Sequence, residues 1–444
     1  MYIAGCLIGQ TISDDPVQYK YDQTVLKARK PDHPIHPLLL SRSSARAMTG
    51  EPISDPELFA LFEAARWAPS AFNIQPWRFV YAKRDTPRFA QLFNALQAAN
   101  QVWVKNASAL VVQLSAKYES YHGNISAVEY NYFDAASAFL SMELEASARG
   151  LVAHPMALFD YDQVFKVLGA SKTAYNMEIM IAVGKRFPDD GHRPAEIITT
   201  RVPITNLHSL FEILVLCLSV LVGLVIGSPL VKIEDDHYDP YPMKFNQIYQ
   251  RKFEDEIHPL LSSRTSQKEM TGAAIPDNDI HKIFEAARWA PSSQNIQPWR
   301  FVYAKHGTPR FAELLATLVP SNQVWAKNAS VIVYVFGANW ETYKGKVLPV
   351  TMNQFDSGSA FMSLSLEANG RGYVSHAIGG VDYEAAYKAL GVTKSSHTVH
   401  VAVALGVPPV TRAAPEVIST RNPSKQFVFE DKFVNTDPDA PPTA

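Results

Sequence analysis

The chain has 444 residues, of which 47 % are hydrophobic and 19 % are charged, and its formal net charge is −2. This composition is typical of a globular chain with room for two or three domains, and it excludes a disordered one. A nearly neutral chain lacks the basic surface that nucleic-acid binding needs, so no nucleic-acid partner is expected.

Cysteine is rare in this chain, with Cys6 and Cys217 its two examples. Neither belongs to a repeated or CxxC-like pattern, which excludes a disulfide framework and a CxxC metal or redox site. The first ten residues lack the basic start and the long apolar core of a secretory signal. These features favour a reducing compartment and predict a cytoplasmic protein.

A long internal repeat is the main feature of the sequence. Phe62–Ser70 recurs letter for letter as Phe284–Ser292, and Asn73–Lys83 recurs as Asn295–Lys305. Both repeats are separated by 222 residues. A constant offset over such a distance indicates two copies of one domain rather than scattered motifs.

The repeat sets the predicted domain boundaries. The first copy is expected over 31–205 and the second over 251–430, and each is long enough to bury its own core. A linker is expected over 206–250. The last residues, 431–444, are rich in Pro and Ala and are predicted to be a disordered tail.

Each copy is predicted to begin with a short basic segment and then an amphipathic helix. In the first copy Asp55 and Pro56 supply a cap and a proline for the first turn. Apolar residues then follow at i, i+3, i+4 and i+7 from Leu58, and the second copy repeats this pattern from Ile280. Such spacing indicates packing against a core rather than chemistry.

The remaining pattern mixes apolar strands with long helices. Buried strands are expected over 78–82, 109–114 and 180–184 in the first copy and over 300–304, 331–336 and 399–406 in the second. Long helices are expected over 133–149 and 355–371, each ended by a glycine. This mixture predicts an α+β layered domain.

An apolar run over 213–231 interrupts the linker. It holds no charged residue, and its nineteen residues are near the minimum for a membrane-spanning helix. A spanning helix would separate the two copies across a membrane, where they could share neither an interface nor a cofactor supply. A buried or interfacial helix, or a junction between two joined genes, is therefore favoured over membrane contact.

A basic and hydroxyl motif opens each copy. Arg42, Ser44 and Arg46 alternate, which places them on one side of an extended segment. The equivalent positions of the second copy hold Arg264, Ser266 and Lys268. Two cations around a hydroxyl suit a phosphate or another oxyanion, whereas an exposed basic strand is the plainer interpretation. Because the motif is kept in both copies while its neighbours differ, we favour the anion site.

The segment Ala68–Trp77 is too rich in Pro, Ser and Asn to continue a helix. It predicts a rigid turn that presents backbone donors and an amide side chain. A packed corner explains Pro76 and Trp77. It explains Ser70 and Asn73 less well, because their polar groups need partners if they are buried.

These motifs together resemble the nitroreductase family of flavin enzymes. The resemblance rests on Arg-x-Ser-x-Arg/Lys, then Ala-Pro-Ser-x-x-Asn-x-Gln-Pro-Trp, then a late Arg-x-Pro at Arg201 and Arg421. It covers 36–203 and 258–423. It implies a three-layer α+β fold in which helices flank a central mixed or antiparallel sheet, with the two copies paired as an intrachain pseudo-dimer.

The resemblance also implies that FMN binds where the copies meet. The phosphate, the ribityl chain and the N1–O2 edge would be held by the opening motif, the pyrimidine ring would face an Asn, and the Pro-Ser-x-x-Asn turn would come from the opposite copy. The implied residues are Arg42, Ser44, Arg46, Asn100, Arg201, Pro291, Ser292 and Asn295 at one site. At the other they are Arg264, Ser266, Lys268, Asn322, Gly379, Gly380, Arg421, Pro69, Ser70 and Asn73.

The copies differ near the expected position of flavin N5. The second copy has Gly379 and Gly380 where the first has Ala157 and Leu158. Glycine allows the backbone to approach a ring closely, so this difference predicts a weakened first site.

The resemblance implies an oxidoreductase that uses NAD(P)H as donor and reduces a nitroaromatic, a quinone or a similar small acceptor in a ping-pong reaction. No side chain has to act as a catalytic group, and no metal is expected, since His33 and His36 have no companion ligands. His154 and His376 are either catalytic or simply packed. The alternatives are a specialised flavin reductase or dehalogenase, and a flavin-binding protein with one or both sites decayed.

Overall fold

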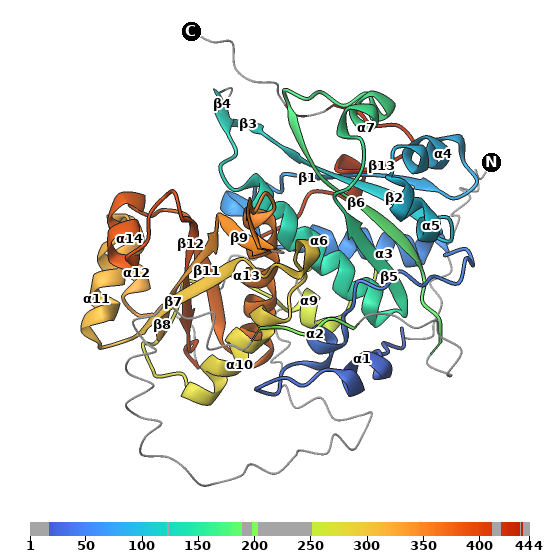
Figure 1. Ribbon diagram of the computed structural model, residues 1–444. Helices are drawn as coiled ribbons and strands as arrows, with labels where there is room; N and C mark the ends of the chain where they lie inside the picture. Colours follow the sequence, from blue (N-terminus) through green and yellow to red (C-terminus); the bar gives the residue numbers. More distant parts are fainter. Residues whose placement is uncertain are drawn as a thin grey trace, which may run out of the picture.

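The computed structural model describes residues 17–121, 124–188, 198–202, 251–343, 345–410, 419–435 and 437. The two copies form two similar α+β units that lie side by side (Figure 1). The predicted fold class, the predicted strands and the predicted long helices are confirmed.

The first copy is built from two short helices, a sheet and further helices around it. Its helices are α1 (Gln23–Ala28), α2 (Pro37–Ser41), α3 (Asp55–Arg66), η1 (Ala71–Asn73), α4 (Pro87–Asn94), α5 (Ala98–Val104), α6 (Asn131–Ala148) and α7 (Tyr161–Leu168). Its strands are β1 (Trp77–Lys83), β2 (Ala109–Ala116), β3 (Tyr118–Tyr121), β4 (Asn124–Ala127), β5 (Leu151–Met156) and β6 (Tyr175–Lys185).

From α9 to β12, the second copy repeats the order of α2 to β6. Its helices are α9 (Pro259–Ser262), α10 (Asp277–Arg288), η4 (Ser293–Asn295), α11 (Pro309–Ala316), α12 (Pro320–Ala326), α13 (Asn353–Gly370), α14 (Tyr383–Leu390) and η5 (Ser424–Gln426). Its strands are β7 (Trp299–Lys305), β8 (Val331–Ala338), β9 (Trp340–Tyr343), β10 (Lys346–Pro349), β11 (Val374–Ile378), β12 (His397–Gly406) and β13 (Val428–Glu430).

Helix α3 begins one residue earlier than the sequence suggested. Its N-cap is Ser54, whose hydroxyl accepts from the Glu57 N–H while the Glu57 carboxylate accepts from the Ser54 N–H. This reciprocal pair is a capping box, and it satisfies two backbone donors at once. Asp55 therefore lies inside the first turn, where its charge complements the helix dipole.

The sheet of the first copy contains a strand from the second. Its order is β13-β1-β2-β6-β5, with β13 parallel to β1 and the other neighbours antiparallel. The Phe79 N–H donates to the Phe427 carbonyl at 2.7 Å where β13 arrives. The sheet of the second copy, β11-β12-β8-β7, is antiparallel throughout. The C-terminal segment thus joins the two copies through backbone hydrogen bonds.

The prediction of a disordered tail from residue 431 onward is wrong for the first part of that segment. Residues 431–435 and 437 are described, and they lie against the first copy. The Phe433 ring is buried and meets the Tyr175 ring edge-on at 5.0 Å. The Arg78 guanidinium donates to the Asp437 carboxylate at 2.8 Å. Aromatic burial and an ion pair order this segment despite its polar composition.

Helices α6 and α13 form the centre of the interface between the copies (Figure 1). Phe133 and Phe361 stack at 5.3 Å between ring centroids, and Phe139 meets Phe355 at 5.7 Å. Both helices are buried around nearly their whole circumference, as expected for elements packed on all sides. The predicted pairing of the copies within one chain is confirmed.

Gly358 sets how closely these two helices cross. A Cβ atom at this position would lie 2.5 Å from the Phe133 carbonyl oxygen. We therefore expect Gly358→Ala to lower the free energy of unfolding by about 1–3 kcal/mol, as overpacking does. Urea denaturation would measure the change. An increase in stability, which the higher helix propensity of Ala would give in an uncrowded helix, would contradict the tight crossing.

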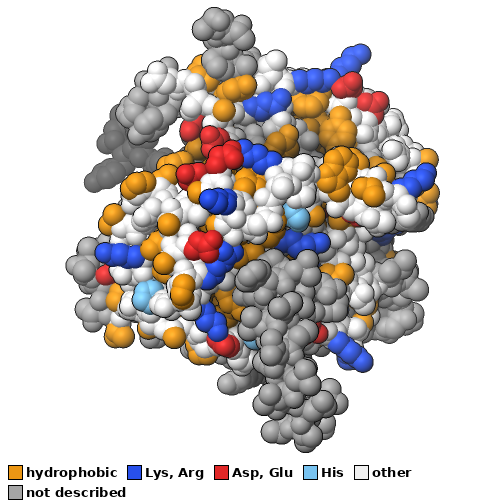
Figure 2. All heavy atoms as spheres, turned by 60° about the vertical axis from the view of Figure 1, so that its left-hand side comes forward, with side chains coloured by type: hydrophobic (Ala, Val, Ile, Leu, Met, Phe, Trp, Pro, Cys, Tyr) orange, Lys and Arg blue, Asp and Glu red, His pale blue; other side chains and the backbone are white. Residues whose placement is uncertain are grey.

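Basic and acidic side chains are interspersed on the face of the molecule that Figure 2 shows. Within the described ranges no helix is long and apolar enough to cross a bilayer. The apolar run at 213–231 lies outside the described residues.

Candidate functional site

Two cavities lie where the copies meet. We call site 1 the cavity between Arg42–Arg46 of the first copy and Pro291–Asn295 of the second, and its volume is about 1100 Å³. Site 2 is its counterpart between Arg264–Lys268 and Pro69–Asn73, and its volume is about 370 Å³. Each cavity is built by both copies, so neither would be complete in a separate copy.

The structure brings together all the residues predicted from the sequence. Site 1 is lined by Arg42, Ser44, Arg46, Asn100, Arg201, Pro291, Ser292 and Asn295. Site 2 is lined by Arg264, Ser266, Lys268, Asn322, Gly379, Gly380, Arg421, Pro69, Ser70 and Asn73. Their individual roles toward a ligand stay predictions.

The Arg of each late Arg-x-Pro motif crosses to the opposite copy. Arg201 donates to the Asn295 side chain and to the Ala290 carbonyl, both at 2.8 Å. Arg421 donates to the Asn73 side chain at 3.0 Å and to the Ala68 carbonyl at 3.1 Å. Each crossing arginine therefore fixes the turn that the opposite copy contributes to a site.

The turns themselves are strained and internally bonded. Phe72, Asn73 and Gln75 have φ values of 50°, 59° and 55°, and their counterparts in the second copy match them closely. Positive φ in bulky residues is costly and tends to occur at functional positions. The Ser70 hydroxyl accepts from the Gln75 N–H at 3.0 Å. Ser70 and Asn73 thus satisfy their polar groups within the protein, as a packed corner requires.

A cluster of buried arginines forms one end of site 1. Arg42 donates to the Glu143 carboxylate at 2.9 Å, and the Ser44 hydroxyl donates to the same oxygen at 2.7 Å. Arg29, which sequence reasoning missed, donates to the Arg42 carbonyl at 2.5 Å. Among the described residues, the Nε–H groups of Arg29, Arg42 and Arg201 have no hydrogen-bond partner.

The electrostatics of this cluster favour an anion. Burial and the neighbouring Arg42 charge lower the pKa of Arg29 to about 9. Burial, and then Arg42 and Arg29, hold the pKa of Arg201 well below its usual range. At site 2 burial and adjacent arginines lower the pKa of Arg421 to about 9. Crowded buried cations with unfilled donors are stabilised by a phosphate or another oxyanion.

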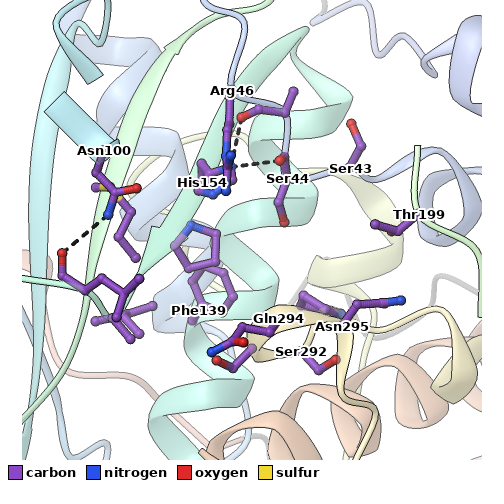
Figure 3. A pocket seen from close by; sticks show the side chains of 18 of the residues that line it. Ser43, Ser44, Arg46, Asn100, Phe139, His154, Thr199, Ser292, Gln294 and Asn295 are labelled. Carbon is purple, nitrogen blue, oxygen red and sulfur yellow. Dashed lines mark hydrogen bonds between the residues drawn. The ribbon is translucent and has the colours of Figure 1, made fainter. Parts of the chain in front are cut away.

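The second cation of the motif, Arg46, lies over a tryptophan ring. The Arg46 guanidinium lies 5.8 Å from the Trp103 ring, and the His154 ring lies 4.6 Å from the same ring. His154 Nδ1 lies 2.7 Å from the Ser44 carbonyl oxygen, which can only accept, so this nitrogen donates (Figure 3). His154 therefore holds the motif in place through this hydrogen bond.

The second copy shows the same arrangement. Lys268 lies 5.5 Å from the Trp325 ring, and His376 Nδ1 donates to the Ser266 carbonyl at 2.9 Å. Burial lowers the pKa of His376 to about 4, which keeps it neutral near pH 7. Packed, hydrogen-bonded histidines are thus favoured over catalytic ones in both copies.

A buried carboxyl anchors each turn to a central helix. The Ala71 N–H donates to Asp134 on α6 at 2.9 Å, and the Ser293 N–H donates to Asp356 on α13 at 3.1 Å. Burial raises the pKa of Asp134 to about 8. The two aspartates are 222 residues apart, which is the offset of the repeat.

The raised pKa of Asp134 predicts a pH dependence. Between its ordinary value of 3.8 and about 8, the folded state keeps a proton that the unfolded state releases. The free energy of unfolding therefore falls as pH rises through this window, by up to about 1.4 kcal/mol per pH unit. Urea titrations at several pH values should show a shallower fall for Asp134→Asn. Identical slopes would contradict the buried, protonated carboxyl.

The glycine pair at site 2 serves contacts within the protein. A Cβ atom at Gly379 would lie 2.7 Å from the Tyr130 hydroxyl, and one at Gly380 would lie 2.4 Å from the Asn322 amide nitrogen. The site without glycines is also the larger. The structure therefore gives no steric reason for the predicted weakening of site 1. Tyr130, Arg29 and Glu143 carried no motif that sequence reasoning could use.

Comparisons with known proteins identify related sequences. The model of the nitroreductase family matches 39–185 and 261–407. A Bacillus subtilis protein provisionally named NAD(P)H nitroreductase YdgI is 28 % identical over 165 residues, which cover 30 % of this chain and 78 % of that protein. A Streptomyces coelicolor protein provisionally named NADH dehydrogenase/NAD(P)H nitroreductase is 30 % identical over 142 residues, which cover 28 % of this chain and 69 % of that protein.

Solved structures match single copies of the repeat. An oxidoreductase described as containing FMN is 33 % identical, and the match covers 41 % of this chain and 96 % of that chain with a TM-score of 0.40. A Desulfovibrio desulfuricans protein, provisionally described as a nitroreductase in complex with FMN, is 26 % identical. The match covers 40 % of this chain and 99 % of that chain, with a TM-score of 0.34. Because the family model matches both halves over more than half of the sequence, the chain belongs to the nitroreductase family of oxidoreductases and carries that domain twice.

Proposed function

We propose that the chain is an FMN-dependent oxidoreductase that passes electrons from NAD(P)H to a small electron-poor acceptor such as a nitroaromatic or a quinone. The observation that carries this proposal is the pair of buried arginine clusters at the cavities between the copies. Among the described residues, no hydrogen-bond acceptor meets the Nε–H groups of Arg29, Arg42, Arg201 and Arg421. Family membership and the NAD(P)H in the relatives' names support it.

The residues of site 1 fit the parts of FMN. Arg29, Arg42 and Arg201 would hold the phosphate, since bidentate guanidinium donors match its oxygens. Ser44 would contact the ribityl chain. Asn100, whose amide donates to the Leu158 carbonyl at 3.4 Å, would face the pyrimidine ring. Site 2 offers the equivalent set, with Lys268 in place of Arg46.

When bound, FMN supplies the hydride chemistry, which no side chain of this site provides. The chain contributes position and charge. Arg46, held over Trp103 and supported by His154 through the adjacent backbone, would place a fixed positive charge at the N1–O2 edge. A preorganised charge favours the electron-rich form of the ring without reorganisation.

The apolar wall of site 1 would exclude water from the reacting atoms. Phe139 and Phe355 come from the two central helices, and Met156 comes from the end of β5. Donor and acceptor would use this one slot in turn, which is the structural basis of a ping-pong reaction. Orientation by rigid walls then supplies much of the rate enhancement.

The proposal is tested on the purified protein. We expect a yellow protein with two FMN per chain, bleached by NADH or NADPH without oxygen and recoloured by a nitroaromatic or a quinone. A folded, colourless protein that does not bind added FMN would refute the function. A flavin that no pyridine nucleotide bleaches would indicate a flavin-binding protein instead.

A further inference from the structure

The two sites differ at a contact that reaches across the copies. At site 2 the Tyr130 hydroxyl donates to the Gly379 carbonyl at 2.8 Å and lies 2.8 Å from the Tyr383 hydroxyl. Tyr130 precedes α6 of the first copy, whereas Gly379 follows β11 of the second. A residue of one copy therefore closes over the strand end of the other.

Site 1 cannot form this contact. The repeat places Met352 at the position of Tyr130 and Ala157 at the position of Gly379. A thioether donates no hydrogen bond. A Cβ atom at position 379 would lie 2.7 Å from the Tyr130 hydroxyl, so Ala157 would not accommodate a tyrosine there. The tyrosine and the glycine form a matched pair, and so do the methionine and the alanine.

The two cavities also differ in volume, and the site that holds the tyrosine is the smaller. Site 2, with about 370 Å³, is near the lower end of the range of about 300–1000 Å³ for pockets that hold one small ligand. Site 1, with about 1100 Å³, has room for a second molecule beside a cofactor. Tyr130 lines site 2 and Met352 lines site 1, so each forms part of the wall of its cavity.

We propose that the sites have unequal roles: site 1 takes the acceptor beside its flavin, whereas at site 2 the Tyr130 ring occupies the acceptor's place. Tyr130 is thus the residue that decides which site admits substrate. This inference rests on the proposed function, because it assumes a flavin at each site.

Binding to the oxidised holoprotein tests the inference without turnover. With no NAD(P)H present, 4-nitrobenzoate cannot be reduced, and equilibrium dialysis counts the molecules bound per chain. We expect one per chain in the wild type and two in Tyr130→Met, which gives site 2 the residue of site 1. The double variant Met352→Tyr/Ala157→Gly gives site 1 the pair of site 2, and we expect it to bind none.

Flavin content, measured on each sample by its absorbance after denaturation, separates the two hypotheses. A protein without flavin would defeat the proposed function rather than this inference. Two flavins with two equivalent nitrobenzoate sites in the wild type would overturn the inference. So would an unchanged stoichiometry of one in Tyr130→Met with both flavins retained.

Discussion

Arg42→Ala should reduce the flavin content from two per chain to one, and Arg264→Ala should empty the other site. Each arginine is buried beside one cavity and would supply charge-assisted donors to a phosphate. The loss of such donors costs about 1.5–3 kcal/mol, or roughly ten- to a hundredfold in affinity. Dialysis followed by flavin absorbance would measure the content, and the double variant should be colourless. Retention of both flavins in both variants would show that these residues do not hold the cofactor.

The chain supplies a matched control for Arg42→Ala. Glu143 is 1 % exposed and paired with Arg42, whereas the equivalent position of the second copy is Ser365. Removing Arg42 leaves a buried, uncompensated carboxylate, which costs about 3–5 kcal/mol of stability. Adding Glu143→Ser removes that charge and should restore stability without restoring the flavin. Arg264→Ala should need no such rescue, because Ser365 carries no charge.

Trp77→Ala should lower the free energy of unfolding by about 3–5 kcal/mol, as large aromatic truncations in a core do. The Trp77 side chain is fully buried between the sheet and helices of the first copy, and its indole N–H has no partner within the described part of the chain. Packing alone therefore explains its place in the Pro-Trp motif. Chemical denaturation with tryptophan-independent detection, such as circular dichroism, would measure the loss.

Two further variants sharpen this expectation. Trp77→Phe keeps most of the buried area and gives up no hydrogen bond, so it should be far milder than Trp77→Ala. Trp299→Ala, the same change in the second copy, should match Trp77→Ala, because Trp299 is equally buried. If Trp77→Ala emptied a flavin site while stability stayed unchanged, the tryptophan would belong to the site rather than to the core.

Duplication within one chain lets the two sites diverge. In a symmetric homodimer every substitution appears at both sites, since the interface is isologous. Here Glu143 corresponds to Ser365 in the other copy, and Tyr130 corresponds to Met352. Tyr130 lines site 2 and Met352 lines site 1, whereas Glu143 is bonded to Arg42 of site 1. Unequal sites are therefore accessible to this chain without any change of oligomeric state.

Some structural features were not predicted from the sequence, and the reasons can be identified. Strand β5 contains Pro155, which usually argues against a strand, yet β5 is an edge strand where proline is tolerated. Strand β13 has three residues and is stabilised by its partner in the other copy, so its own pattern was too short to detect. The cap at Ser54 was assigned one residue late because Asp55 is also a good cap residue.

The sequence by itself determined the duplication, the α+β class, the core helices and the motif residues found in the two cavities. These depend on periodicity and on motifs whose members are close in the chain, where local preferences act. Only the tertiary structure decided that each arginine of the late motif crosses to the opposite copy, that Arg42 pairs with Glu143, and that Tyr130 reaches Gly379. These partners are about 90 to 350 residues apart. Their contacts depend on how whole helices and sheets pack, which no local pattern encodes.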